Sequence, residues 1–276
     1  MLNNNIHLTI ITLSKNDNKK LLRTLKSLNS QKINMKVEWL IIDGSSKIAY
    51  KKNDELIKTL FNYKKEKYLL IKHIDSNVKR IFGIYPCMNY GKKMSKGKFI
   101  IFLNGGDQFY NKNSLQIILD NTLTKFKKHT LIFGQAHIIA SSKLSWFFPG
   151  TELSNFKKWI KLFEPNHQAM IISNSLANII DFPTNMESIS DGYWKRLIIK
   201  SSQEIIYINK PIIKFFLDGV STIKPSTKEM LKILKNEKIY LIRKIIFLIK
   251  YLFPKRLFFL YHKIQKYKSL LVDFIF

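Results

Sequence analysis

Polar side chains follow three apolar segments of the chain, and their types suit the binding of a ligand and a cation. Ser14 follows one run of β-branched residues, Asp43 follows a second, and Asp107 follows a third. Asp107 closes the sequence NGGD (104–107), in which the glycines let a ligand approach the backbone and the carboxylate can hold a cation. The alternative is an ordinary polar turn, because Asn, Gly and Asp favour turns.

Two further side chains have the chemistry for acid–base catalysis. Asp191 begins a segment with apolar residues at helical spacing, where a carboxylate either caps the helix or serves as a general base. His167 precedes an apolar, strand-like run, a position more typical of a hydrogen-bonded structural histidine than of a catalyst. The local sequence leaves both alternatives open.

The elements that must position these residues alternate between strands and helices. Apolar, β-branched runs predict buried strands over 7–14, 37–42, 68–74 and 99–103. Helices are predicted between them, after a cap at Asn16-Asp17 and over 55–63 and 85–94. This alternation predicts an α/β fold with a mainly parallel sheet and helices on both faces.

In such a sheet, ligands bind beyond the carboxyl ends of the strands. Ser14, Asp43 and Asp107 all follow such ends, so we expect them at one edge of the sheet. The sequence has no GxGxxG motif, so a dinucleotide-binding fold has no support.

The chain after residue 107 gives a more mixed pattern. A helix is predicted over 114–126 and a strand over 131–139. The aromatic segment 141–153 is rich in turn residues and predicts a loop over a substrate site or a hydrophobic surface. Residues 208–221 predict a short strand pair that ends in a turn at Gly219.

The composition is globular with a strong basic excess. There are 47 Lys and Arg against 19 Asp and Glu, a formal net charge of +28. Such a charge attracts phosphates, although dispersed lysines usually form a solvated surface. The single Cys87 excludes an internal disulfide, and neither a signal peptide nor a membrane-spanning run is predicted. We therefore expect a cytoplasmic protein.

The last 53 residues differ in kind, so we divide the chain into a domain at 1–223 and a tail at 224–276. The tail holds 13 Lys and Arg against 3 Asp and Glu, a net charge of +10, between many apolar residues. Pro254 divides it into two predicted helices. We interpret it as a basic amphipathic tail on an anionic membrane surface. The alternative is a hairpin that packs on the domain with its lysines outward.

Five segments in order resemble the family 2 glycosyltransferases of GT-A fold, most closely the bacterial branch that builds colanic-acid-type exopolysaccharide, capsule or O-antigen. They are TIITLSKN (9–16), WLIIDGSS (39–46), GIYPCMNYGKKMSKGKFIIFLNGGD (83–107), NHQAMII (166–172) and FFLDGVS (215–221). The third is long and specific, while the others are weaker but occur in the family's order. The resemblance covers residues 7–221 and implies a GT-A fold.

The resemblance implies a nucleotide-sugar site at the ends of the first strands. Asp43 would hydrogen-bond the base, while Thr12, Ser14 and Ser45 would line the nucleotide site. Asn89 lies where the family contacts the donor.

The resemblance also implies an inverting transfer that depends on a divalent metal. Asp107 is similar to the carboxylate that holds Mn²⁺ or Mg²⁺ on the donor's diphosphate, with Asn104 beside it. Asp191 sits where the inverting enzymes keep their general base, and His167 is left as an acceptor-side or structural residue. The implied acceptor is a lipid-linked or growing glycan at the inner face of the cell membrane.

Three departures from the family's pattern keep an inactive relative open, and the basic charge keeps a second rival open. Ile81 replaces a usual Asp, Pro86-Cys87 replaces Asp-Ala, and Asp218 replaces the first glycine of GGVS. The first rival is an inactive GT-A protein that binds nucleotide or membrane. The second is a basic nucleic-acid-binding protein, against which the dispersed charge and the absence of a nucleic-acid motif both count. We therefore expect no nucleic-acid partner.

Overall fold

The computed structural model describes residues 6–61, 68–123, 126–150, 153, 156–185, 190–218, 231 and 234–235. The predicted turn at Gly219, the boundary at residue 223 and nearly all of the tail at 224–276 lie outside this part of the chain. Within it, no helix combines the length and apolarity that a membrane crossing needs.

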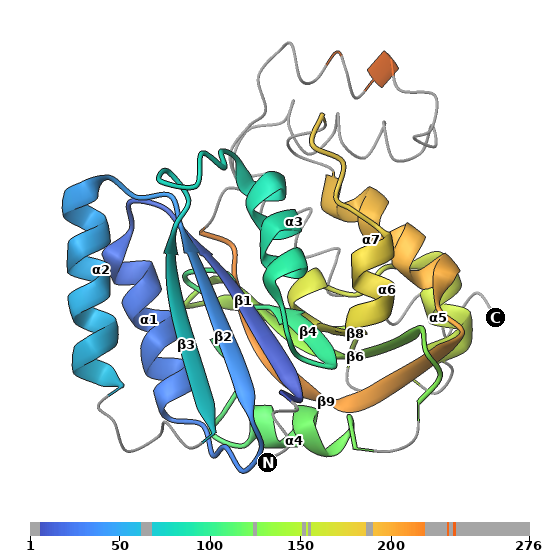
Figure 1. Ribbon diagram of the computed structural model, residues 1–276. Helices are drawn as coiled ribbons and strands as arrows, with labels where there is room; N and C mark the ends of the chain where they lie inside the picture. Colours follow the sequence, from blue (N-terminus) through green and yellow to red (C-terminus); the bar gives the residue numbers. More distant parts are fainter. Residues whose placement is uncertain are drawn as a thin grey trace, which may run out of the picture.

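A nine-stranded sheet runs through the described part of the molecule, with helices on both faces (Figure 1). The strands are β1 Leu8–Ser14, β2 Val37–Asp43, β3 Leu69–Asp75, β4 Phe99–Phe102, β5 Gln108–Phe109, β6 Thr130–Ser141, β7 Leu144–Phe148, β8 Met170–Ser173 and β9 Glu204–Phe216. The helices are α1 Asn18–Asn29, α2 Lys47–Leu60, α3 Ile84–Met94, α4 Ser114–Asp120, α5 Phe156–Leu162, the 3₁₀ turn η2 His167–Ala169, α6 Asn174–Ile179 and α7 Ser190–Ser201.

The sheet has the strand order β3-β2-β1-β4-β8-β6-β9-β5, with β7 paired to β6. Strands β1 to β4 pair in parallel, as expected from the alternation of strands and helices. Strand β8 is antiparallel to both of its neighbours, and β5 and β7 are also antiparallel to their partners. The prediction of a mainly parallel sheet therefore holds for the first half, and the second half is mixed.

Strands β1, β2 and β4 are buried on both faces because helices cover both, whereas β3 at the edge of the sheet is mostly half-buried. Leu8, Ile10 and Trp39 face one core with α1, α2 and α4. Their neighbours Ile11 and Leu40 face the other core, with α3, α6 and α7. This explains why the strands read as continuous apolar runs and not as alternating ones.

Four predicted elements differ from the structure. The helix predicted over 55–63 is α2, which begins eight residues earlier at Lys47 and ends at Leu60. The aromatic loop over 141–153 is wrong in part, because Leu144–Phe148 forms β7, which pairs with β6. Aromatic side chains favour a strand when a partner edge is available. The helix predicted over 114–126 ends at Asp120.

Where a strand pair was predicted over 208–221, the described residues form the end of the single strand β9 Glu204–Phe216. Pro211 within it has no N–H to donate to the ladder. In the structure Pro211 lies opposite Gln135 where the β6–β9 register shifts on both sides. The proline therefore sits at an irregularity where the ladder is already interrupted.

Candidate functional site

Three strands end together at the carboxyl edge of the sheet. The register pairs Ser14 of β1 with Asp43 of β2, and Asp43 with Asp75 of β3. The structure thus brings Ser14 and Asp43 together as predicted. Asp75 was missed by the sequence reasoning, although it directly follows an apolar strand just as Asp43 does.

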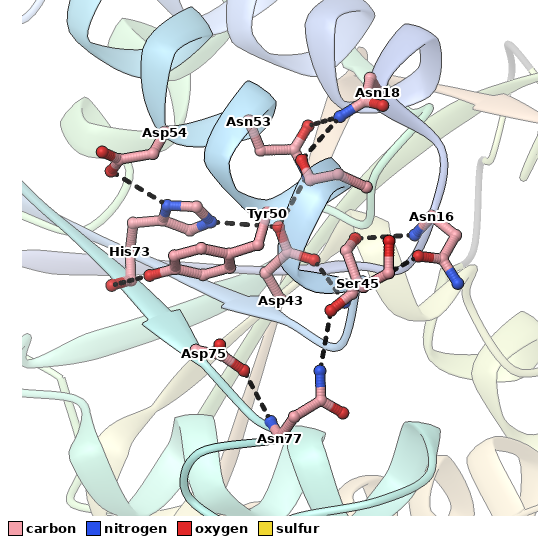
Figure 2. A network of polar contacts seen from close by, with 12 residues as sticks. Asn16, Asn18, Asp43, Ser45, Tyr50, Asn53, Asp54, His73, Asp75 and Asn77 are labelled. Carbon is pink, nitrogen blue, oxygen red and sulfur yellow. Dashed lines mark hydrogen bonds and ion pairs between the residues drawn. The ribbon is translucent and has the colours of Figure 1, made fainter.

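Asp43 is fully buried and held by protein donors (Figure 2). Its Oδ1 accepts from the Ser45 backbone N–H at 3.0 Å, and its Oδ2 accepts from Asn53 Nδ2 at 2.7 Å. His73 Nε2 lies 3.1 Å from the same Oδ2. Burial raises the pKa of Asp43, but the hydrogen bonds from His73, Ser45 and Asn53 outweigh it and hold the pKa below its usual range. The carboxylate is therefore ionised and fixed in orientation.

His73 connects Asp43 to helix α2 (Figure 2). Its Nδ1 lies 3.3 Å from Asp54 Oδ1, and its ring stacks on Tyr50 with centroids 4.1 Å apart. The Tyr50 hydroxyl donates to the His73 carbonyl at 3.2 Å. These contacts join β2, β3 and α2 into one polar network behind the edge of the sheet.

The accessible rim of this edge is made by other residues (Figure 2). The Asn16 N–H donates to Ser45 Oγ at 2.7 Å, and Asn77 Nδ2 donates to the Ser45 carbonyl at 2.8 Å. Asp75 Oδ1 accepts from the Asn77 N–H at 2.8 Å. Asn16 and Asn77 are exposed, Ser14 and Asp75 are half-buried, and Ser45 is buried.

Two of the predicted donor residues are turned into the protein. Thr12 is fully buried, donates to the Leu103 carbonyl at 2.6 Å and accepts from Trp39 Nε1 at 2.8 Å. Asn89 is also buried and makes two hydrogen bonds with the backbone of Phe182, at 2.9 and 2.8 Å. Both side chains thus have structural partners, and their predicted donor contacts stay predictions.

The turn 104–107 lies against the end of β1. The Gly105 N–H donates to the Leu13 carbonyl at 2.9 Å, and a Cβ at Gly105 would lie 3.0 Å from that oxygen. Gly106 has a φ of 108°, which favours glycine. The glycines therefore serve a close approach between the turn and β1, which places Asp107 beside the Ser14 edge.

Asp107 is buried and accepts two hydrogen bonds. Its Oδ1 accepts from the Phe216 N–H at 2.8 Å, and its Oδ2 accepts from the Gln168 amide. Burial raises the pKa of Asp107 to about 7, although the bonds from Phe216 and Gln168 and the nearby Arg23 act to lower it. The carboxyl can therefore change its protonation state near neutral pH.

Asn104 offers a second oxygen on the same turn. Its Oδ1 is buried and has no hydrogen-bond partner. The turn is closed by the Asp107 N–H, which donates to the Asn104 carbonyl at 3.0 Å. Carboxylate and amide oxygens are ligands that hard divalent cations prefer, so this pair fits Mn²⁺ or Mg²⁺. Among the residues that the structure describes, no group of three or more His, Cys, Asp or Glu is placed to hold a metal ion.

Asp218, which departs from the family's pattern, closes this side of the site. It lies 3.0 Å from Arg23 Nη2 and 4.0 Å from Lys20 Nζ, both on α1. The Arg23 guanidinium also stacks over the Phe216 ring at 3.9 Å. The carboxylate therefore pairs with two cations close to Asp107.

The third part of the site joins Asp191 to His167. Asp191 lies in the first turn of α7 with about a third of its side chain exposed, and its Oδ2 is 3.6 Å from His167 Nδ1 and 3.9 Å from Lys195 Nζ. Burial lowers the pKa of His167 to about 4, against the opposite effect of Asp191, so the ring is neutral near pH 7. His167 Nε2 is buried without a hydrogen-bond partner. The carboxylate thus has a neutral ring on one side and an ammonium on the other.

The 3₁₀ turn η2 connects Asp107 with Asp191 because its consecutive residues contact one carboxylate each. Its first residue, His167, faces Asp191, and its second, Gln168, bonds Asp107. Gln168 also accepts from the Asn104 N–H through its Oε1 at 3.1 Å. Gln168 was missed by the sequence reasoning, and its only signal was its place beside His167 in the NHQAMII segment.

The arrangement of strands and helices is that of the GT-A fold. Solved structures of TarS from Staphylococcus aureus share it. The 1–349 fragment with UDP-GlcNAc is 16% identical with a TM-score of 0.57, and the alignment covers 90% of this chain and 72% of that one. The same fragment in a second structure is 17% identical with a TM-score of 0.55, over 90% and 71% of the two chains.

A longer TarS chain aligns with 90% of this chain, at 16% identity and a TM-score of 0.55. This chain then spans only 43% of the TarS length. No known family profile and no curated protein matches the sequence. At this level of identity the likeness establishes the fold.

Proposed function

We propose that the chain is an inverting glycosyltransferase that moves a sugar from a nucleotide-diphosphate sugar to an acceptor hydroxyl. One observation carries the proposal: Ser14, Asp43 and Asp75 end in register at the carboxyl edge, and the Asp107 turn packs against the same strand end. Strand order reverses beside β1, and open α/β sheets bind ligands at that switch point. TarS, which shares the fold, has been crystallised with UDP and with UDP-GlcNAc.

The nucleoside would lie on the rim formed by Ser14, Asn16, Asp75 and Asn77. These residues carry both donors and acceptors and are at least partly accessible. In this proposal Asp43 fixes the rim through its bond from the Ser45 N–H. A direct contact between Asp43 and the base requires the groups that cover the carboxylate to move.

The diphosphate would lie beside the 104–107 turn. Asp107 and Asn104 would hold a Mn²⁺ or Mg²⁺ ion there, and the bound ion would neutralise charge that develops on the leaving diphosphate. Arg23 and Lys20 add positive charge nearby, although Asp218 pairs with both. The described residues therefore supply oxygen ligands and cations on the side where the leaving group would sit.

Asp191 would act as the general base. Its carboxylate takes the proton of the acceptor hydroxyl, the acceptor oxygen forms a bond to the anomeric carbon, and the bond from that carbon to the diphosphate oxygen breaks. The nucleoside diphosphate leaves with the bonding electrons, and attack from the opposite face inverts the anomeric centre. His167 lies beside Asp191 and is neutral near pH 7, so it does not form a cation–carboxylate ion pair that would make Asp191 a weaker base.

We assign the acceptor to a lipid-linked or growing polysaccharide in bacterial surface-glycan synthesis. The sequence resemblance over residues 7–221 supports this assignment. The basic tail at 224–276 would hold the enzyme on the anionic inner face of the cell membrane, as a peripheral protein.

The test is release of nucleoside diphosphate from a panel of nucleotide sugars in the presence of a membrane extract. Asp191→Asn should lower the turnover by about 10²–10⁴-fold, since it removes a positioned base. The same variant should bind nucleotide as tightly as the parent chain. Turnover equal to the parent in Asp191→Asn would exclude this residue as the base.

A second candidate is a GT-A protein that binds nucleotide but transfers nothing. Both Asp107 oxygens already accept protein hydrogen bonds, and Asp43 is fully covered, which favours a closed site. This candidate predicts nucleotide binding with no release from any donor. The panel above separates it from the proposed enzyme.

A further inference from the structure

The loop 76–83 between β3 and α3 carries an unusual group of exposed apolar side chains. Val78 is 75% exposed and Phe82 is 66% exposed, and Ile84, the first residue of α3, is 38% exposed. Lys79 and Arg80 lie between them and are also exposed. We call Val78, Phe82 and Ile84 with these two cations the basic-apolar tip.

The tip is held outward by a fixed backbone. The Lys79 N–H donates to the Asp75 carbonyl at 3.2 Å, and the Ile81 N–H donates to the Ser76 carbonyl at 2.8 Å. The Ile81 side chain packs into the core that contains α3, so the loop has one inward apolar anchor. The remaining apolar side chains therefore stay exposed in an ordered loop, and apolar groups gathered in this way mark an interaction surface.

The tip adjoins the candidate nucleotide rim. Asn77 precedes Val78 and donates to the Ser45 carbonyl, while Asp75 precedes the loop at the end of β3 (Figure 2). The loop lies at the carboxyl end of the sheet (Figure 1). Whatever the tip binds therefore lies next to the edge where a donor would sit.

We propose that the basic-apolar tip docks on an anionic lipid surface and faces the candidate site toward the membrane. Lys79 and Arg80 would contact anionic headgroups, and Val78 and Phe82 would enter the boundary between headgroups and acyl chains. The tip is complementary to an anionic lipid surface because it combines cations with apolar groups and carries no acidic side chain. The role of this surface in presenting a lipid-linked acceptor rests on the proposed function.

A tryptophan at position 82 tests the docking on the full chain. The four native tryptophans, Trp39, Trp146, Trp159 and Trp194, are all buried, so a new exposed one reports on the loop. Phe82→Trp should shift to shorter emission wavelength and be quenched on phosphatidylglycerol vesicles with brominated acyl chains. Ile48→Trp is the matched control, because Ile48 of α2 is 84% exposed and lies outside the tip.

The charge requirement is tested by Lys79→Glu with Arg80→Glu in the Phe82→Trp background. This pair should raise the lipid concentration needed for half-maximal quenching by about tenfold or more. Lys51→Glu with Lys52→Glu, an exposed pair on α2, should change it by less than about twofold. Equal effects of the two pairs would overturn the proposal.

Two other results would also overturn it. One is equal quenching of Phe82→Trp and Ile48→Trp while the protein is bound to vesicles. The other is blue-shifted Phe82→Trp emission before lipid is added, which would mean that another part of this chain or a second copy covers the tip. Stabilisation by nucleotide, measured on the same variants, tests the proposed function separately, since the tip lies outside the nucleotide rim.

Discussion

Asp107 is the residue at which burial and chemistry compete most clearly. Its carboxyl is 5% exposed and accepts bonds from the Phe216 N–H and the Gln168 amide. Two donors favour the ionised form, yet burial raises the pKa to about 7. A cation at this turn would stabilise the ionised form and resolve the conflict.

The pH dependence of stability follows from this pKa. The folded-state pKa is above the ordinary value of 3.8, so the stability that Asp107 contributes is full below 3.8 and is lost as the pH rises to about 7. Without metal, the melting temperature of the parent chain should fall relative to Asp107→Asn between pH 5 and pH 8, by on the order of 5 °C. Thermal melts across this range measure it.

Asp120→Asn serves as the control, because Asp120 is exposed. Its melting temperature should follow that of the parent chain at every pH. A constant difference between Asp107→Asn and the parent chain would show that Asp107 has an ordinary pKa.

At the scale of elements, α3 holds the segment that leads to the candidate base. Asn89 makes paired bonds with the Phe182 backbone, and the buried Lys92 donates to the carbonyl of Ala177 and pairs with Asp181 at 3.0 Å. Burial lowers the pKa of Lys92, and Asp181 opposes the shift. These contacts fix the 177–182 segment, which precedes α7 and Asp191.

Loosening these contacts should affect transfer more than nucleotide binding. Asn89→Ala leaves the buried Phe182 N–H and carbonyl without partners, which should cost about 2–4 kcal/mol of unfolding free energy. Urea unfolding measures this cost. In the transfer assay, turnover should fall while nucleotide affinity changes by less than about twofold. An equal loss of both would instead place Asn89 at the donor, as the sequence resemblance implied.

Gly97, just before β4, and Gly192 of α7 give a matched pair of glycine-to-alanine tests. A Cβ there would lie 2.5 Å from the Thr9 backbone N and 2.6 Å from the Leu8 carbonyl carbon, so Gly97→Ala should cost about 3 kcal/mol or more. Gly192 of α7 has open space around a Cβ, and Gly192→Ala should stabilise the helix by up to about 1 kcal/mol. Urea midpoints compare the two, and a tolerated Gly97→Ala would contradict the packing of β1 against this turn.

The first half of the fold could be predicted because β1, β2 and β4 are mainly apolar runs, each with a polar residue at or just beyond its carboxyl end. Ser14 and Asp43 were placed at one edge from that pattern alone, and the register confirms that they are neighbours. The second half could be predicted only in part: the strand expected over 131–139 is confirmed as β6, but Leu144–Phe148 becomes a strand only when β6 offers a partner. Tertiary contacts also set the orientation of the Thr12 and Asn89 side chains, which turn inward to hydrogen-bond partners distant in sequence. The local sequence does not show these partners.

At the scale of the whole molecule, the two halves of the sheet meet at the site. The parallel half supplies Ser14, Asp43 and Asp75, and the mixed half supplies Gln168 and the Phe216 N–H that hold Asp107. The formal net charge of +28 gives the chain as a whole a positive potential that attracts phosphorylated ligands. Nucleotide binding should therefore weaken with added salt.

Binding of a nucleoside diphosphate at this edge is tested by a thermal-shift titration with UDP, GDP, dTDP and CMP, with and without Mn²⁺. A ligand of the folded state raises stability with the logarithm of its saturation. We expect one nucleoside diphosphate to raise the melting temperature, more strongly with Mn²⁺, and Asp43→Asn and Asp107→Asn to reduce this effect. No shift with any of the four nucleotides would contradict the proposed binding.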